Sequence, residues 1–188
     1  MREDTKDGMA ISAGSTYGGN AANEYYFDAD DGGQDVLGIF MKLNLGCGPK
    51  RMHMKGYVNV DVLSDADMVM NVATQNWGWG SGTVEYIRAD NLLEHLNNAE
   101  FLHVMNEAHR VLAANGMFWF RVPNALSWPD GAFGDPTHQR YFVPRSFYYL
   151  DHEHDQWKNY GCYYGFKPWV VNVGGTERFF EATCKAIK

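Results

Sequence analysis

Two glycines on either side of a cysteine, Gly46-Cys47-Gly48, follow directly on a short apolar run that starts at Met41. Glycine takes positive φ without strain and lacks a side chain, so this turn lets a ligand approach the backbone closely. The apolar run predicts a buried strand, and loops at the carboxyl ends of parallel strands are where open α/β sheets bind ligands. This glycine loop is therefore the first candidate binding site, with a plain strand-to-loop turn as the alternative.

The residues around the glycine loop discriminate between nucleotide cofactors. A dinucleotide site requires Gly-x-Gly-x-x-Gly, in which the third glycine lets the helix pack tightly against the strand. Here Arg51 occupies the position of the third glycine. Asp61 follows Gly48 after 13 residues, whereas a dinucleotide fold places its acidic residue about 20 residues on. This spacing leaves room for about one helical turn and disfavours NAD.

S-adenosylmethionine places fewer demands on the chain. Its methionine carboxylate needs backbone N–H donors at close approach, which a glycine loop offers. Its ribose diol suits a carboxylate at the end of the second expected strand, where Asp61 falls. Its adenine requires apolar walls, which Val62, Val72 and Leu92 are placed to supply. A helix cap or a turn is the alternative role for Asp61.

Four short segments follow one another at the expected strand and helix ends. They are Leu43-Asn44-Leu45-Gly46-Cys47-Gly48, Gly56-Tyr57-Val58-Asn59-Val60-Asp61, Leu93-Glu94-His95-Leu96, and Arg110-Val111-Leu112 with Gly116. In this order they resemble the motifs of class I S-adenosylmethionine-dependent methyltransferases. More narrowly, they resemble the small branch whose first motif reads LNLGCG, which is often found with glycan-modifying and phage genes. The match covers Lys42 to about Asn124, with a weaker similarity in Pro144-Arg145-Ser146-Phe147.

The resemblance implies a Rossmann-like three-layer α/β sandwich. Its sheet would be mostly parallel and seven-stranded, ordered 3-2-1-4-5-7-6, with an antiparallel C-terminal hairpin. It also carries cofactor roles onto Gly46, Gly48, Asp61, Asn71 and Asp90. The full predicted cofactor site is Asn44, Gly46, Cys47, Gly48, Asp61, Val62, Asn71, Val72, Asp90, Asn91 and Leu92. Two of these depart from the family pattern, because Asn44 and Asn71 stand where acidic residues are usual. Asparagine lacks the charge that favours a sulfonium cofactor, so the departures predict weaker affinity or a degenerate site.

Two histidines are candidate catalytic bases. Methyl transfer is an in-line displacement, so positioning the nucleophile supplies much of the catalysis. An oxygen or nitrogen nucleophile also needs a base near neutral pH, which histidine provides. His95 follows the fourth expected strand, and His138 lies in Asp135-Pro136-Thr137-His138-Gln139-Arg140-Tyr141 after the fifth. We predict catalytic or substrate-binding roles for His138 and His95; the alternative is that each pins a loop or helix end by hydrogen bonds.

Three further features of the sequence need an interpretation. The run Asp151-His152-Glu153-His154-Asp155 carries metal-ligand types, but it is polar throughout and lacks a further ligand, so we predict a solvated loop and no metal site. Cys47 is predicted to be a small packing residue without a lowered pKa. Aromatic residues in the segment 125–164 either line an acceptor pocket or form the core of a lid: Trp128, Phe133, Tyr141, Phe142, Phe147, Tyr148 and Tyr149.

Alternating strand and helix patterns must position these residues. Strands are expected at 56–62, 68–72, 84–89 and 117–122, and a closing hairpin at 169–173 and 179–186 turns at Gly174-Gly175. A helix capped by Asn97 or Asn98 is expected to end at Asn115-Gly116. Its apolar residues recur at helical spacing: Phe101, Leu102, Met105, Ala108, Val111 and Leu112. Strands that alternate with helices imply a mostly parallel sheet with crossovers.

Composition bounds the domain organisation and the partners. The length of 188 residues fits one methyltransferase-like domain at 38–188, with the aromatic-rich insert 125–164, after a flexible or loosely docked arm at 1–37. Residues 1–40 contribute −6 of the net charge of −7, from two basic and eight acidic side chains. No basic stripe remains, so strong nucleic-acid binding is not expected.

The cysteine count and the lengths of the apolar runs indicate the cellular compartment of the protein. Three cysteines without a Cys-x-x-Cys pair fit a reducing cytoplasm better than a disulfide or zinc framework. No apolar run reaches the ~18 residues of a membrane span, and no signal peptide is visible. We expect a cytoplasmic protein without a membrane partner, and the sequence leaves its oligomeric state open.

These patterns predict an enzyme that transfers a methyl group from S-adenosylmethionine to a small-molecule or glycan-type acceptor. One alternative is a catalytically degenerate module that binds a ligand or a partner without turnover, which Asn44, Asn71 and the short first crossover favour. The other alternative is an NAD-dependent oxidoreductase, which Arg51 and the short spacing to Asp61 disfavour.

Overall fold

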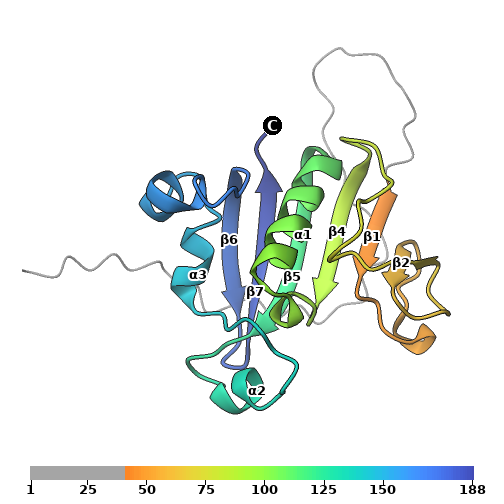
Figure 1. Cartoon of the computed structure of the whole chain (residues 1–188), viewed down its shortest axis with the longest axis horizontal. Coiled ribbons are helices and arrows are strands. Elements are labelled where there is room, and N and C mark those ends of the chain that lie inside the picture. Colours follow the sequence, from red (N-terminus) through yellow and green to blue (C-terminus); the bar gives the residue numbers. More distant parts are fainter. Residues whose placement is uncertain (1–40) are drawn as a thin grey trace, which may run out of the picture. The chain divides into compact units, whose positions relative to one another are not determined.

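The computed structural model describes residues 41–188, so the predicted arm at 1–37 and its boundary at residue 38 lie outside the described residues. Within 41–188 a single sheet is formed (Figure 1). Its strands are β1 (Met41–Leu45), β2 (Val58–Asp61), β3 (Met68–Val69), β4 (Val84–Asp90), β5 (Leu112–Pro123), β6 (Trp169–Gly175) and β7 (Phe179–Ala186). The helical elements are η1 (Lys50–Met52), η2 (Leu93–His95), α1 (Asn98–Val111), α2 (Pro129–Phe133), α3 (Pro144–Tyr148) and η3 (Trp157–Gly161).

The strands lie in the order β3-β2-β1-β4-β5-β7-β6, which confirms the order implied by the resemblance. β1 to β5 pair in parallel, whereas β7 runs antiparallel to both β5 and β6. The predicted α/β class, with a mostly parallel sheet and a C-terminal hairpin, is therefore confirmed. Because parallel strands end on the same side, the residues that follow β1, β2, β4 and β5 meet at one edge of the sheet, called the carboxyl edge below.

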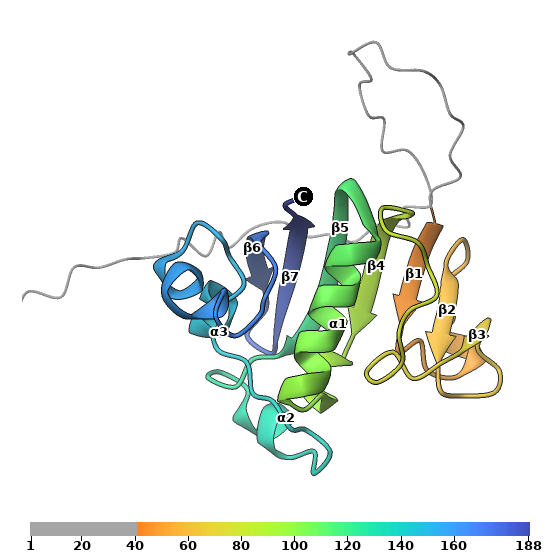
Figure 2. The same cartoon turned by 45° about the horizontal axis from the view of Figure 1, so that its top comes forward.

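The connections between the first strands are short. η1 is a single turn between β1 and β2, as the spacing from Gly48 to Asp61 predicted. The segment 70–83 joins β3 to β4 without a helix, and it is held against α1 because the backbone N–H of Trp77 donates to Glu107 over 2.9 Å. Figure 2 shows α1 lying along β4 and β5 on one face of the sheet.

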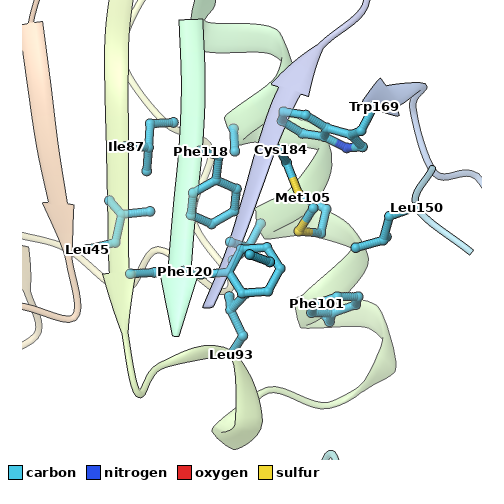
Figure 3. Close-up of a cluster of buried hydrophobic side chains, with 14 of the residues drawn as sticks. Leu45, Ile87, Leu93, Phe101, Met105, Phe118, Phe120, Leu150, Trp169 and Cys184 are labelled. Carbon is cyan, nitrogen blue, oxygen red and sulfur yellow. The ribbon is translucent and has the colours of Figure 1, made fainter. Parts of the chain in front are cut away.

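The hydrophobic core lies between α1 and the sheet (Figure 3). Met105 of α1 is fully buried against this face, as are Phe118 and Phe120 of β5. Trp169 of β6 is fully buried as well, and its ring packs against Phe118. The helical spacing of apolar residues predicted this buried face of α1 correctly, apart from a half-buried Leu102.

The predicted end of the helix is wrong. Asn97 caps α1 as predicted, accepting from the backbone N–H of Glu100 in a capping box. The helix ends at Val111, and Leu112 already has the extended conformation of β5. Asn115 does have a positive φ of 65°, but inside β5, beside the register shift between β4 and β5. The Asn-Gly pair therefore bends a strand and does not stop a helix.

The segment 125–164 packs its own short helices onto the sheet. Phe147 of α3 is 1% exposed and its ring lies against Phe120 and Phe180 of the sheet. Part of the insert thus belongs to the main core. Within residues 41–188 no helix combines the length and the apolar character that crossing a bilayer requires.

Candidate functional site

The glycine loop lies at the carboxyl edge, directly after β1. Gly46 and Gly48 have φ values of 61° and 67°, which is the left-handed region that favours glycine. A Cβ on Gly46 would lie 3.0 Å from Cδ1 of Leu92, a contact so tight that the Leu92 side chain would have to shift. The glycine at position 46 therefore lets the segment after β4 pack directly against the loop.

Asp61, at the end of β2, holds the other side of the loop. Its Oδ2 accepts from the backbone N–H of Gly48 over 2.9 Å, and its Oδ1 accepts from Leu63 N–H over 3.2 Å. The side chain is half-buried. Each carboxylate oxygen has two lone pairs, so Asp61 can accept further hydrogen bonds from a diol while it holds the loop.

Asn44 supports the loop from inside the protein. Its side chain is buried and donates to Oδ1 of Asn59 on β2 over 3.0 Å. Asn59 in turn accepts from the backbone N–H of Met54 and donates to Asp67. The amide at position 44 therefore joins β1 to β2 through a buried polar network, where an unpaired acid would be costly.

The other residues of the predicted cofactor site occupy different environments. Val62 is 62% exposed, whereas Val72 is 5% exposed and belongs to the core. Asn71 is exposed, and its side chain accepts from the backbone N–H of Ala73 in a turn that ends the third strand early. Asn91 is exposed with a positive φ of 52°. The structure thus brings Leu92 to the glycine loop and leaves Val72 beneath the surface.

Asp90, at the end of β4, is paired with two arginines. Its Oδ1 accepts from Nε of Arg121 over 2.6 Å, and its Oδ2 accepts from Arg88 over 2.6 Å and from Arg121 over 3.0 Å. Arg121 lies opposite Asp90 on β5. The carboxylate therefore fastens the ends of β4 and β5 together.

The cysteine of the glycine loop is not a nucleophile. Cys47 is 4% exposed, and its backbone N–H donates to the carbonyl of Val60 over 3.2 Å. Burial, together with the nearby negative charge of Asp61, raises the pKa of the Cys47 thiol to about 11. The thiol therefore stays protonated at neutral pH, as expected for a packing residue.

His95 and His138 come together at the carboxyl edge. Their ring centroids are 4.8 Å apart, with the planes at 70° to each other. Nδ1 of His95 lies 2.9 Å from the hydroxyl of Thr137, and Nδ1 of His138 lies 2.8 Å from the carbonyl oxygen of Ala132. Burial lowers the pKa of His95, and the charge of His138 acts in the same direction. His95 therefore favours the neutral form.

Sequence reasoning missed Glu94, the residue next to His95. Its side chain is 1% exposed, and neither carboxylate oxygen has a hydrogen-bond partner in the described part of the chain. Burial raises the pKa of Glu94 to about 7, and the negative charge of Asp90 adds to this effect. The signal was the acid itself, since Glu94 and His95 are flanked by the apolar residues Leu92, Leu93 and Leu96.

Four backbone and side-chain contacts hold the histidines in place. The carbonyl of Glu94 accepts from the backbone N–H groups of Gln139 and Arg140, over 2.8 and 3.0 Å. The side chain of Gln139 donates to the carbonyl of His95 over 2.8 Å, and Arg140 donates to Asn98 over 2.8 Å. These bonds tie the segment after α2 to η2 and thereby place His138 beside His95.

The predicted aromatic residues are spread over the core, a pocket and the exposed surface. A cavity of about 570 Å³ opens between the start of α1 and the insert, lined among others by Phe101, Arg140, Tyr141, Phe142 and Tyr149. The guanidinium of Arg140 lies 4.1 Å above the ring of Phe101. The insert therefore provides both core residues and the walls of a pocket.

The run 151–155 uses its histidines for packing. Nδ1 of His152 lies 3.0 Å from the carbonyl oxygen of Trp169, and Nδ1 of His154 accepts from the backbone N–H of Gln156. The ring of His154 also stacks on Tyr148. Through these contacts the histidines of 151–155 attach the loop to β6 and to the residues that follow the loop, although their residue types would also suit a metal ion.

Comparison with known proteins identifies the fold. The sequence matches no protein-family model and no curated protein. A SAM-dependent methyltransferase from Archaeoglobus fulgidus superposes with a TM-score of 0.54 at 12% identity, over 79% of this chain and 87% of that one. One from Methanosarcina mazei gives 0.52 at 12%, over 78% and 92%.

A third similar structure was solved with its ligands. The 1,6-didemethyltoxoflavin-N1-methyltransferase of Burkholderia thailandensis, with 1,6-didemethyltoxoflavin and S-adenosylhomocysteine bound, gives a TM-score of 0.51 at 11% identity, over 79% and 71% of the two chains. At such identities the likeness establishes the fold alone. Residues 41–188 therefore have the fold of the class I S-adenosylmethionine-dependent methyltransferases.

Proposed function

We propose that this chain binds S-adenosylmethionine at the glycine loop and transfers its methyl group to a small-molecule or glycan-type acceptor. One observation carries the proposal: the hydrogen bond of 2.9 Å from Gly48 N–H to Asp61, which joins the loop after β1 to the acid after β2. This pairing puts close backbone approach and a carboxylate side by side, as a methionine end and a ribose diol require.

The glycine loop also supports the choice of cofactor. η1 begins two residues after Gly48, at Lys50, and Arg51 follows in the position of the third dinucleotide glycine. A pyrophosphate needs that glycine for tight helix–strand packing. The loop suits a ligand without a pyrophosphate, which favours S-adenosylmethionine over NAD.

The aromatic cavity supports the acceptor class. Its volume of about 570 Å³ falls in the range of small-molecule sites. Aromatic walls stack on planar rings and on the apolar faces of sugars, and Arg140 offers hydrogen bonds to an acidic or hydroxylated group. Arg140 is two residues from His138, the predicted base, so acceptor and base residues belong to the same short segment.

Calorimetric titration with S-adenosylhomocysteine, with NAD as the parallel control, tests the cofactor assignment. We expect micromolar binding of S-adenosylhomocysteine and none of NAD. Binding of NAD alone would overturn the proposal in favour of an oxidoreductase. Binding of S-adenosylhomocysteine without methyl transfer to a broad panel of sugars and small hydroxyl compounds would favour the degenerate module, to which the amides of Asn44 and Asn71 point.

The expectations on location and partners stay predictions from composition. A cytoplasmic protein without nucleic-acid or membrane partners is consistent with the acidic charge and the cysteine pattern. A gel-shift assay on the full chain tests binding to nucleic acid, and a vesicle-flotation assay tests binding to membranes. Binding in either assay would contradict the prediction.

A further inference from the structure

Three potential metal ligands converge where η2 meets the segment after α2. One nitrogen of His95, one nitrogen of His138 and one carboxylate oxygen of Glu94 lie within 4.8 Å of one another. We propose that Glu94, His95 and His138 form a binding site for a divalent transition-metal ion such as Zn²⁺. The sequence predicted no metal site, and the one run that resembled a site, 151–155, is a different part of the chain.

The hydrogen bonds around His95 fix its tautomer. The hydroxyl of Thr137 donates to Oδ1 of Asp135 over 2.6 Å, so its oxygen is left to accept from Nδ1–H of His95. Nε2 of His95 then carries the free lone pair. An imidazole held in this way by an oxygen acceptor is the usual arrangement of a metal-binding histidine.

The same arrangement holds for His138. A carbonyl oxygen can only accept, so the contact of 2.8 Å to Ala132 requires a proton on Nδ1 of His138. Nε2 again keeps its lone pair, and a carboxylate oxygen of Asp135 lies 3.9 Å from it. Both rings are thus oriented by partners outside the site, with their basic nitrogens left over.

The burial of the Glu94 carboxyl group supports the metal site independently of the two histidines. A carboxyl group that is 1% exposed and has no hydrogen-bond partner on either oxygen, within residues 41–188, is costly to keep in a fold. The backbone N–H of Arg140 donates to the Glu94 carbonyl, but its guanidinium is directed to Phe101 and Asn98. A bound cation would satisfy the Glu94 carboxylate, and this accounts for an acid in a buried turn.

The ligand chemistry favours a transition metal over Mg²⁺ or Ca²⁺. Two imidazoles and one carboxylate are a set that Zn²⁺ and Fe²⁺ bind, with coordination positions left for water or a hydroxyl. Bonds of about 2.0–2.1 Å to zinc in a tetrahedral site place the ligand atoms about 3.3 Å apart, so their separations would shorten by up to about 1.5 Å on binding.

The metal and the base role predicted for the two histidines exclude each other. A lone pair that binds a metal cannot take a proton from an acceptor, whereas a free Nε2 can. The metal assignment does not depend on the proposed methyl transfer. The test of the metal site therefore has to measure metal binding itself.

Titration of the full chain with Co²⁺, after removal of bound metals with a chelator, provides that test. We expect one Co²⁺ per chain with visible absorption bands, displaced by Zn²⁺. Glu94→Gln and His138→Gln should each weaken Co²⁺ binding at least tenfold. Glu153→Gln and His154→Gln, from the run 151–155, are the matched controls and should leave it unchanged.

Two outcomes would overturn the proposal: no stoichiometric Co²⁺ binding, or binding that survives both Glu94→Gln and His138→Gln. If a variant fails to fold, zinc anomalous scattering from crystals of the wild-type chain decides instead, since a peak elsewhere refutes the site. Titration of the metal-free chain with S-adenosylhomocysteine separates this proposal from the proposed function. Cofactor binding without a metal site leaves the methyltransferase assignment intact, and metal binding without the cofactor leaves the metal site intact.

Discussion

Asp61 and Gly48 are 13 residues apart in the chain, yet the carboxylate of one accepts the backbone N–H of the other over 2.9 Å. This bond closes the glycine loop against the end of β2. It makes Asp61 part of the loop's structure as well as a candidate ligand for a ribose diol, and the two roles can be separated by substitution.

Asp61→Ala should weaken S-adenosylhomocysteine binding by about 1–3 kcal/mol, since two hydrogen bonds to a charged group are lost. Asp61→Asn keeps an acceptor for Gly48 N–H and should lose less. Asp65→Ala is the control, because Asp65 accepts only a backbone N–H of η1, from Lys50. Calorimetry measures affinity and thermal melting checks the fold. Equal affinities for Asp61→Ala and wild type would refute the ribose assignment.

Gly46→Ala should destabilise the protein more than Gly82→Ala. Both glycines have positive φ, of 61° and 73°, so each substitution carries a backbone strain of about 1–2 kcal/mol. Only at Gly46 would the new Cβ also meet Leu92, at 3.0 Å, whereas nothing lies within 4 Å at Gly82. Urea unfolding should show a further loss of about 1–3 kcal/mol for Gly46→Ala. Equal losses would mean that Leu92 does not pack on the loop.

Glu107→Gln should destabilise the protein by about 1–2 kcal/mol at neutral pH. Glu107 accepts from Arg110 over 2.7 and 2.8 Å and from Trp77 N–H over 2.9 Å, which holds the segment 70–83 on α1. The bonds from Arg110 hold the pKa of Glu107 below its ordinary value of 4.5.

The sign of the pH dependence follows from this lowered pKa. The contribution of Glu107 is fully present above pH 4.5 and is lost as the pH falls through the lower pKa of the folded state. The gap between wild type and Glu107→Gln should therefore narrow below pH 4.5. Glu85→Gln is the control, because Glu85 makes a partly exposed ion pair with Lys42 and should change stability little. A difference in stability that stays constant down to pH 3 would contradict the role of the charged Glu107 in holding the segment 70–83 on α1.

The three cysteines should differ in reactivity. Burial raises the pKa of the thiols of Cys47 and Cys184, whereas Cys162 is only half-buried. Iodoacetamide at pH 7.5 should therefore modify Cys162 first in the native protein, as peptide mass spectrometry would show. Preferential modification of Cys47 would indicate a more open glycine loop than the structure has.

The sequence by itself determined the elements and their class. Alternation of apolar residues located the strands, helical spacing located the buried face of α1, and Asn97 was identified as its cap. The strand order was implied by the resemblance of the ordered motifs to the class I methyltransferases. The strand, helix and cap signals are local, since each depends on residues within one or two turns, and this is why they can be read without a fold. Asn115 misled for the same reason, because a left-handed Asn-Gly can end a helix or bend a strand.

Only the tertiary structure decided how the site residues meet. His95 and Thr137 are 42 residues apart, and Asp90 and Arg121 are 31 apart, yet both pairs are in hydrogen-bond contact. No local pattern encodes these distances, because they depend on how the insert after β5 folds back over the carboxyl edge. Glu94 shows the physical reason most clearly. Its type and position could be read from the sequence, but its burial without a partner depends on every element packed around it.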